Sequence, residues 1–286
     1  MRQPTANSRA VFLSGDVAAI LDTLVQHGFP VYLWGFSAID AYLGRGGTVE
    51  TLALTGADAA DLAKIFEETR YPGIGLADVA VDRGESACYF RCADFGSVSP
   101  DARFFFSGEG PFPAGEGRRP SFKFLEFYQD WLTGRFFDPQ GIYPLLRQCL
   151  QGSAPLHTEA KLLPEAFQFD LDPCVEYCRA LMDWALILSR NFANEPFLNE
   201  PLHLNKARLQ KQLLLLDSLS KGPPPGLEEQ RLLLSGLMTS PNPGLGLEFL
   251  KSKGFIEEYW PELAVLDDVD HSKEFHPEGN VWKHTL

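Results

Sequence analysis

The sequence is poor in positive charge. Its 25 Lys and Arg residues are outnumbered by 38 Asp and Glu residues, which gives a formal net charge of −13 at pH 7. A strong non-specific grip on nucleic acid requires clustered Lys and Arg, because most of that affinity comes from neutralising phosphates. The composition therefore argues against such a grip, and only a local basic groove is compatible with it.

Long apolar runs and a secretory leader are also missing. No apolar run reaches the ~18 residues that a membrane helix needs, and residues 1–16 lack the apolar region of a signal peptide. The five cysteines include no paired CxxC motif. An odd number of cysteines in a chain this long fits reduced thiols better than a disulfide framework. We therefore expect a cytoplasmic protein without a membrane partner.

What the chain does have is an informative stretch at residues 31–55, which is typical of strand, glycine turn, helix, turn and strand. Residues 31–34 form a short apolar run that Gly35 ends, as expected for a buried strand. Residues 37–43 carry apolar side chains at helical spacing, and residues 50–54 form a second apolar run. A glycine turn that opens a helix after a strand can cradle a phosphate with its backbone N–H groups. The same pattern is also common where no phosphate binds.

The first half of the chain is predicted to mix helices and strands. Amphipathic spacing predicts helices at residues 17–27, capped by Ser14 or Asp16, and at residues 58–68. Short apolar runs predict a hairpin of residues 79–81 and 88–90 around a turn at residues 82–84.

The second half is predicted to be all-helical. Helical spacing occurs at residues 173–188, 204–219, 228–238 and 245–253. No strand pattern and no internal repeat of fixed period are found after about residue 152. The predicted fold class is α+β, with a mixed-sheet first domain followed by helices and a boundary between residues 150 and 160.

Three blocks of the sequence resemble one family, the class II tRNA nucleotidyltransferases (CCA-adding enzymes) and poly(A) polymerases. Residues 241–263, PNPGLGLEFLKSKGFIEEYWPEL, and residues 275–286, FHPEGNVWKHTL, resemble the end of the family's helical body and the start of an HD-type phosphohydrolase domain. Residues 118–141, RRPSFKFLEFYQDWLTGRFFDPQG, resemble the family's RRDFTINAL…TGRFFDPFGG block. Gly35 and Asp40 match the glycine turn and the Arg-Asp pair that open the family's head domain.

The resemblance implies three parts. They are a nucleotidyltransferase-like head at residues 1–152, an RNA-binding-like helical neck and body at residues 153–268, and the start of an HD-type domain at residues 269–286. Because that last motif is incomplete at Leu286, we expect the chain to be a piece of a longer protein. The family adds nucleotides from ATP or CTP to RNA 3′ ends, such as the tRNA 3′ end, without a template and with Mg²⁺. Whether the head adds CCA or poly(A) stays open.

The resemblance also implies roles for individual residues. Glu50 would be the catalytic, Mg²⁺-binding carboxylate, and His284 would be the first metal ligand of a complete HD domain. The implied nucleotide-binding residues are Gly35, Asp40, Arg118, Arg119 and Asp172.

The sequence departs from the family at positions where the family's chemistry requires a particular side chain. Where the family has Asp-x-Asp, whose side chains share one strand face, this chain has Glu50 and Leu52. Glu50 can bind a metal ion, whereas Leu52 cannot. The second glycine of the turn is Phe36, and the arginine before Asp40 is Ile39.

The nucleotide-binding blocks are altered too. Pro120 replaces the aspartate after the arginine pair, Phe124 replaces an asparagine, and Val175 stands where an arginine should follow Asp172. We therefore predict little or no nucleotidyl transfer. Three other classes of function stay open: an inactive nucleotide- or RNA-binding module, a scaffold for an HD phosphohydrolase domain, and a structural interaction domain.

Overall fold

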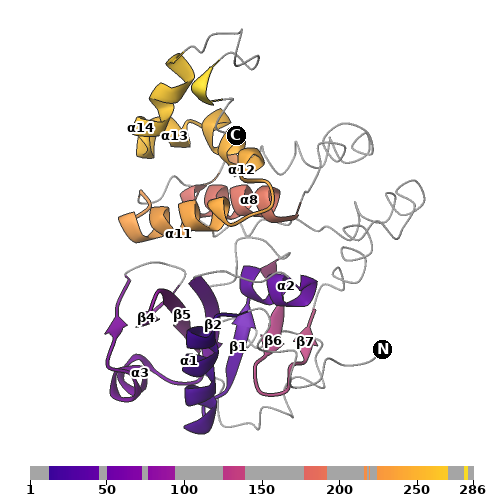
Figure 1. Cartoon of the computed structure of the whole chain (residues 1–286), viewed down its shortest axis with the longest axis vertical. Helices are drawn as coiled ribbons and strands as arrows, with labels where there is room; N and C mark the ends of the chain where they lie inside the picture. The colour runs from indigo at the N-terminus through magenta and orange to yellow at the C-terminus, as the bar shows by residue number, and fades with distance from the viewer. Residues whose placement is uncertain are drawn as a thin grey trace, which may run out of the picture. The chain divides into compact units, whose positions relative to one another are not determined.

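The computed structural model divides the chain into two compact units, Met1–Pro173 and Cys174–Leu286 (Figure 1). The predicted boundary near residue 152 lies outside the described residues and stays a prediction. The structure describes residues 13–44, 50–72, 77–93, 125–138, 177–191, 216–217, 219, 224–269 and 280–282.

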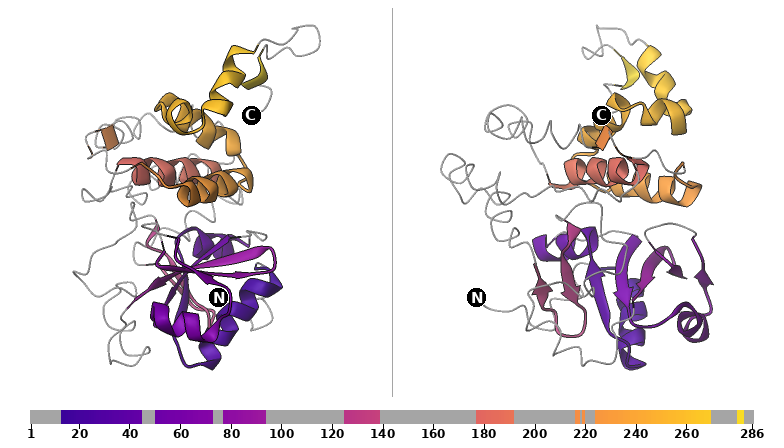
Figure 2. Two further views of the ribbon diagram at one scale, coloured as in Figure 1. Left: turned by 90° about the vertical axis from the view of Figure 1, so that its left-hand side faces the viewer. Right: turned by 180° about the vertical axis from the view of Figure 1, so that it is seen from behind.

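The first unit is built on a seven-stranded sheet, which the right-hand view of Figure 2 shows from behind. Its strand order is β3-β4-β5-β2-β1-β6-β7. Strands β2 and β5 pair in parallel, and the other neighbours pair antiparallel. The helices of this unit are α1 (Gly15–Gln26), α2 (Phe36–Leu43) and α3 (Ala59–Ile65). The strands are β1 (Val31–Trp34), β2 (Glu50–Thr55), β3 (Thr69–Arg70), β4 (Val79–Arg83), β5 (Ser86–Cys92), β6 (Tyr128–Asp130) and β7 (Phe136–Phe137).

The sheet has two distinct faces, because side chains alternate along each strand. Helices α1 and α2 cover one face, as their place against the strands in Figure 1 shows. On that face, Ser14 at the start of α1 bonds Ser86 of β5 (Oγ–Oγ 2.8 Å), and Tyr42 of α2 packs edge-on against Phe136. The other face, called the Glu50 face below, carries side chains placed there by strand register: Tyr32, Trp34, Glu50, Leu52, Leu54, Arg70, Asp82, Tyr89, Arg91 and Tyr128.

Helix α1 confirms the predicted helix and decides its cap. The Ser14 Oγ accepts a hydrogen bond from the Val17 N–H at 3.2 Å, so Ser14 and not Asp16 is the N-cap. The buried side chains recur at helical spacing: Val17, Ile20, Leu21 and Leu24. This apolar stripe anchors α1 to the sheet.

Two predicted elements have different ends in the structure. Helix α3 stops at Ile65 instead of Glu68, because Phe66 turns extended and the chain enters strand β3. The hairpin turn lies at Gly84 and Glu85 instead of residues 82–84, because both strands are longer than predicted. Gly84 has φ +59°, which glycine adopts without steric cost and which suits a two-residue hairpin turn.

The second unit is helical over its described residues. The predicted helices at 228–238 and 245–253 are confirmed, whereas most of the one at 204–219 lies outside the described residues. This region confirms the α+β class, since no strand occurs in residues 177–191 or 224–269. The helices are α8 (Tyr177–Asn191), α11 (Leu227–Met238), α12 (Pro243–Ser252), α13 (Phe255–Tyr259), α14 (Pro261–Ala264) and the 3₁₀ helix η4 (Val265–Asp268).

Helices α8 and α12 cross with a glycine at their contact. A Cβ atom on Gly246 would lie 2.2 Å from the Ser189 Oγ and 2.7 Å from the backbone oxygen of Ala185. Only glycine therefore allows this approach of the two helix backbones. Among the described residues, no helix is both long and apolar enough to cross a membrane.

Candidate functional site

The glycine turn that the sequence predicts is present between β1 and α2. Gly35 has φ +56°, a conformation that favours glycine. Its N–H donates to the carbonyl oxygen of Phe127 at 3.0 Å, so this donor is already used within the protein. Phe36, which replaces the family's second glycine, is the first residue of α2 and is only 7% exposed. The turn therefore has the expected geometry, but its first N–H is engaged.

The structure brings this turn beside strand β2. The Ser37 Oγ, in the first turn of α2, accepts a hydrogen bond from the Leu52 N–H at 2.8 Å. The turn and residues 50–52 are thus joined locally, as the strand–turn–helix–strand pattern predicts. Asp40 lies further along α2 and is 5% exposed. Its role in nucleotide binding stays a prediction.

Strand β2 places Glu50 and Leu52 on one face, as expected from strand alternation. Both side chains are partly exposed, whereas Thr51 between them is fully buried on the helix-covered face. Leu52 packs against an apolar cluster. The members of this cluster are Tyr32, Trp34, Leu54 and Tyr128.

The residues of this face do not fit the two Mg²⁺ ions that the resemblance implies. Mg²⁺ takes oxygen ligands, and Leu52 offers none. Its surroundings are apolar, so an ion beside it would lose hydration without compensation. Within the described ranges, no group of three or more His, Cys, Asp or Glu side chains could hold a metal ion. The role of Glu50 as a metal ligand stays a prediction.

Two arginines on the Glu50 face were not predicted as site residues from the sequence. Arg91 of β5 pairs with Leu54 in the parallel register, and its guanidinium lies 5.0 Å from the centre of the Trp34 ring. Arg91 is 6% exposed. Strand alternation within residues 86–92 could have placed Arg91 beside Tyr89, but nothing local indicates which strands flank β5.

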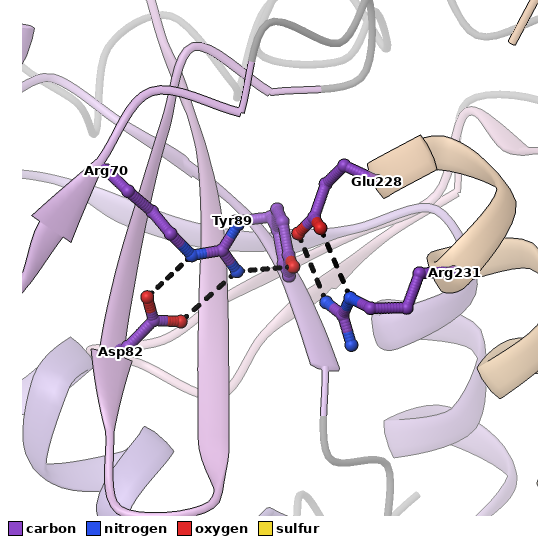
Figure 3. Close-up of polar contacts among 5 residues, drawn as sticks. All are labelled: Arg70, Asp82, Tyr89, Glu228 and Arg231. Carbon is purple, nitrogen blue, oxygen red and sulfur yellow. Dashed lines mark hydrogen bonds and ion pairs between the residues drawn. The ribbon is translucent and has the colours of Figure 1, made fainter. Parts of the chain in front are cut away.

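Arg70 is the second of these arginines, and Figure 3 shows how it is held. Its Nε donates to the Asp82 Oδ2 at 2.6 Å, and its Nη2 donates to the Asp82 Oδ1 at 3.2 Å. The same Nη2 donates to the Tyr89 hydroxyl at 2.6 Å, and the guanidinium lies 5.1 Å from the Tyr89 ring centre. Tyr89 is the register partner of Leu52. Arg70 is therefore held by Asp82 of β4 and Tyr89 of β5.

Figure 3 also draws an ion pair of the second unit. Arg231 donates from Nε and Nη2 to the two carboxylate oxygens of Glu228, at 3.2 and 3.1 Å, one turn apart on α11. Pairs of this spacing stabilise a helix by a few tenths of a kcal/mol. This pair is part of the surface of α11 and has no counterpart among the predicted site residues.

Four predicted site residues lie outside the described residues. They are Arg118, Arg119, Asp172 and His284. Their implied roles, in nucleotide binding for the first three and in an HD metal site for His284, stay predictions.

Cys92, at the end of β5, is expected to react slowly with alkylating reagents. Burial, with smaller contributions from the nearby carboxylates of Asp78, Asp58 and Asp61, raises its pKa to about 12. Only the thiolate is nucleophilic, so at pH 9 the folded protein should react roughly 500-fold more slowly than an unperturbed thiol. Alkylation by iodoacetamide, followed by mass spectrometry of the Cys92 peptide, measures this rate.

The pH profile gives the control for Cys92. Since the pKa of the Cys92 thiol is raised in the folded protein, its alkylation rate there should keep rising up to about pH 12. In urea-unfolded protein, the alkylation rate should level off near the ordinary pKa of the thiol. The same shift lowers the stability of the fold as the pH rises from the ordinary value towards 12. Equal rates in folded and unfolded protein at pH 9 would contradict the assignment.

Comparison with solved structures finds proteins of similar architecture. A CCA-adding enzyme in complex with ATP is 13% identical and aligns with 91% of this chain and 54% of its own, at a TM-score of 0.41. The Bacillus stearothermophilus CCA-adding enzyme in complex with CTP is 19% identical, with 87% and 58% of the two chains covered and a TM-score of 0.33. A tRNA nucleotidyltransferase complexed with a primer tRNA and an incoming ATP analogue is 16% identical, with 90% and 78% covered and a TM-score of 0.33.

These similarities are loose. No family model and no curated protein matches the sequence. The chain spans little more than half the length of the first two solved structures. At these identities and TM-scores, the comparisons carry no argument about activity or ligands.

Proposed function

We propose that this protein is a member of the tRNA nucleotidyltransferase/poly(A) polymerase family whose head no longer transfers nucleotides and serves in nucleotide binding. The three motif blocks support the family, and the β1–Gly35–α2–β2 unit supports the head. The proposed ligands are ATP or CTP and the 3′ end of an RNA such as tRNA. The alternative within the same family is a weakly active transferase.

The main support for a loss of nucleotidyl transfer is the leucine at position 52. It occupies the position of the second metal-binding carboxylate and shares a face with Glu50, the first. Two Mg²⁺ ions held roughly 4 Å apart repel one another, and carboxylates and substrate phosphates must offset this repulsion. Glu50 supplies one negative group, whereas Leu52 packs against aromatic side chains. Among the described residues, Glu50 and Leu52 therefore do not supply the paired negative charge that the family's reaction requires.

The test is a transfer assay with labelled ATP or CTP, Mg²⁺ and tRNA that lacks its 3′-terminal nucleotides. We expect no extension of the tRNA above the background of a Glu50→Ala variant, because the unmodified protein already lacks the pair. Gel electrophoresis of the labelled RNA measures this. If the unmodified protein adds nucleotides at about 1 per second or faster, and Glu50→Ala abolishes this addition, the proposal is wrong.

A second candidate function is a scaffold for an HD-type phosphohydrolase domain. Trp282 belongs to the block that resembles the start of that domain. Its Nε1 donates to the Glu248 Oε1 at 2.8 Å, and its ring lies 4.7 Å from the Lys251 Nζ. Both partners are on α12, so Trp282 is held against this helix. Under this alternative His284 would bind a divalent metal, and a phosphodiesterase assay with Mn²⁺ on the unmodified protein and on His284→Ala tests it.

A further inference from the structure

Residues 50–52 of strand β2 extend past the end of its ladder with β1. That ladder ends at the Leu33–Ala53 pair, whereas β5 pairs with β2 along the whole length of β2. This part of β2, with Glu50 at its start, therefore has a neighbouring strand on one side and lies beyond the last pair of the ladder on the other. Backbone groups at such a position need another partner.

The Ser37 side chain supplies that partner on the β1 side. Its Oγ accepts a hydrogen bond from the Leu52 N–H at 2.8 Å. Ser37 lies in the first turn of α2, two residues after Gly35, and is only 6% exposed. A single hydroxyl thus links the helix that follows the glycine turn to the backbone of β2 beyond the ladder.

The same bond joins the two parts of the head that the proposed function assigns to the nucleotide. The glycine turn at Gly35 would hold phosphate, and Glu50 lies two residues before Leu52 on the same strand face. A ligand that contacts both parts binds more tightly when their separation is fixed beforehand, because less conformational entropy is then lost on binding. The Ser37 hydroxyl fixes this separation through the backbone of Leu52.

We infer that Ser37 is a positioning residue for nucleotide binding by the head, because its hydroxyl holds the glycine turn against the Glu50 end of β2. It acts through the Leu52 N–H and not through contact with the ligand. This inference rests on the proposed function for the nucleotide as ligand. It adds a residue to which the family resemblance assigns no role.

Hydrogen exchange of single backbone amides, followed by NMR with and without ATP, tests the inference on the unmodified protein. We expect saturating ATP to slow exchange of the Leu52 N–H at least about fivefold, because a ligand held by the turn and Glu50 opposes opening of the Ser37–Leu52 bond. The Ala57 N–H is the internal reference. It donates to the Thr55 Oγ1 at 3.2 Å, at the opposite end of β2, and its exchange should change less than about twofold.

Substitution of Ser37 gives a second measurement. Ser37→Ala removes only the hydroxyl and should weaken ATP binding about five- to tenfold in isothermal titration calorimetry, the typical effect of one lost hydrogen bond. Ser37→Thr keeps a hydroxyl on the same carbon and should restore the affinity to within about twofold. Circular dichroism shows whether each variant is folded.

Thr55→Val is the matched control. It removes a hydroxyl that accepts a backbone N–H at the other end of the same strand. Its free energy of unfolding should fall, because the buried Ala57 N–H loses its acceptor. Its affinity for ATP should equal that of the unmodified protein.

The outcomes separate this inference from the proposed function. ATP binding that Ser37→Ala leaves unchanged, or that does not slow exchange at Leu52, overturns the inference and leaves nucleotide binding intact. Equal weakening by Ser37→Ala and Thr55→Val also overturns it, since both hydroxyls would then act through general stability. Failure of the unmodified protein to bind ATP overturns both. If a Ser37 variant does not fold, exchange at Leu52 in the unmodified protein decides.

Discussion

Gly246→Ala is expected to destabilise the helical unit by about 2 kcal/mol. The new methyl group would lie 2.5 Å from the Leu237 Cδ2 and 2.7 Å from the backbone oxygen of Ala185, and that carbonyl can move only with helix α8. Overpacking of this kind costs up to about 3 kcal/mol. Alanine recovers about 1 kcal/mol as the better helix former. Urea unfolding followed by far-UV circular dichroism measures the change in free energy.

Gly236→Ala is the control for this prediction. Gly236 also lies in a helix of the same unit, but an added Cβ would first meet the Cδ2 of Leu186 at 2.8 Å, at the end of a flexible side chain. That side chain can shift, so the free energy of unfolding should change by less than about 1 kcal/mol. If Gly246→Ala unfolds at the same urea concentration as Gly236→Ala, the close crossing of α8 and α12 is wrong.

Leu52→Asp, which restores the second carboxylate, is expected to destabilise the head by about 2 kcal/mol and to leave transfer absent. The substitution removes apolar surface packed against Trp34, Leu54 and their neighbours, and places a charge in apolar surroundings. Adding Phe36→Gly should not rescue transfer, because the Gly35 N–H still donates to Phe127. Urea unfolding and the tRNA extension assay measure the two effects.

Leu132→Asp is the control, because it makes the same substitution at an exposed residue. Leu132 lies in the turn after β6 and is 59% exposed, so the same substitution should change the free energy of unfolding by less than about 0.5 kcal/mol. Nucleotide addition by the Leu52→Asp variant at rates typical of enzymes would show that one substitution rebuilds the site. The packing of Leu52 would then not be the obstacle inferred here.

Much of the local structure was determined by the sequence alone. The apolar run before Gly35, the helical spacing of α1 and α12, and the alternation in β2 all predict elements that the structure contains. These signals are local, because capping, glycine turns and the periods of helix and strand act over a few residues. They were enough to place Glu50 and Leu52 on one face. The resemblance in the motif blocks then gave the position of the missing carboxylate.

The choice between neighbouring local structures already required the tertiary fold. Spacing within the sequence left Ser14 and Asp16 as alternative caps, and the structure selects Ser14, which also bonds Ser86 of β5. Apolar spacing also predicts that the helix of α3 extends to Glu68. In the structure this helix ends at Ile65, because the following residues form strand β3, which pairs with β4. Sheet pairing satisfies backbone groups across long sequence separations, and it can override helical periodicity.

The surroundings of Leu52 were decided only by the tertiary structure. The parallel register of β2 and β5 sets Tyr89 beside Leu52 and Arg91 beside Leu54, and the antiparallel partner β1 supplies Trp34 beneath the Arg91 guanidinium. No local pattern encodes which strands become neighbours or in which register. That choice depends on burying the apolar side chains of all the strands at once. The sequence therefore predicts a missing metal ligand at residue 52, whereas only the fold shows that Arg91 lies opposite Leu54 with its guanidinium over the Trp34 ring.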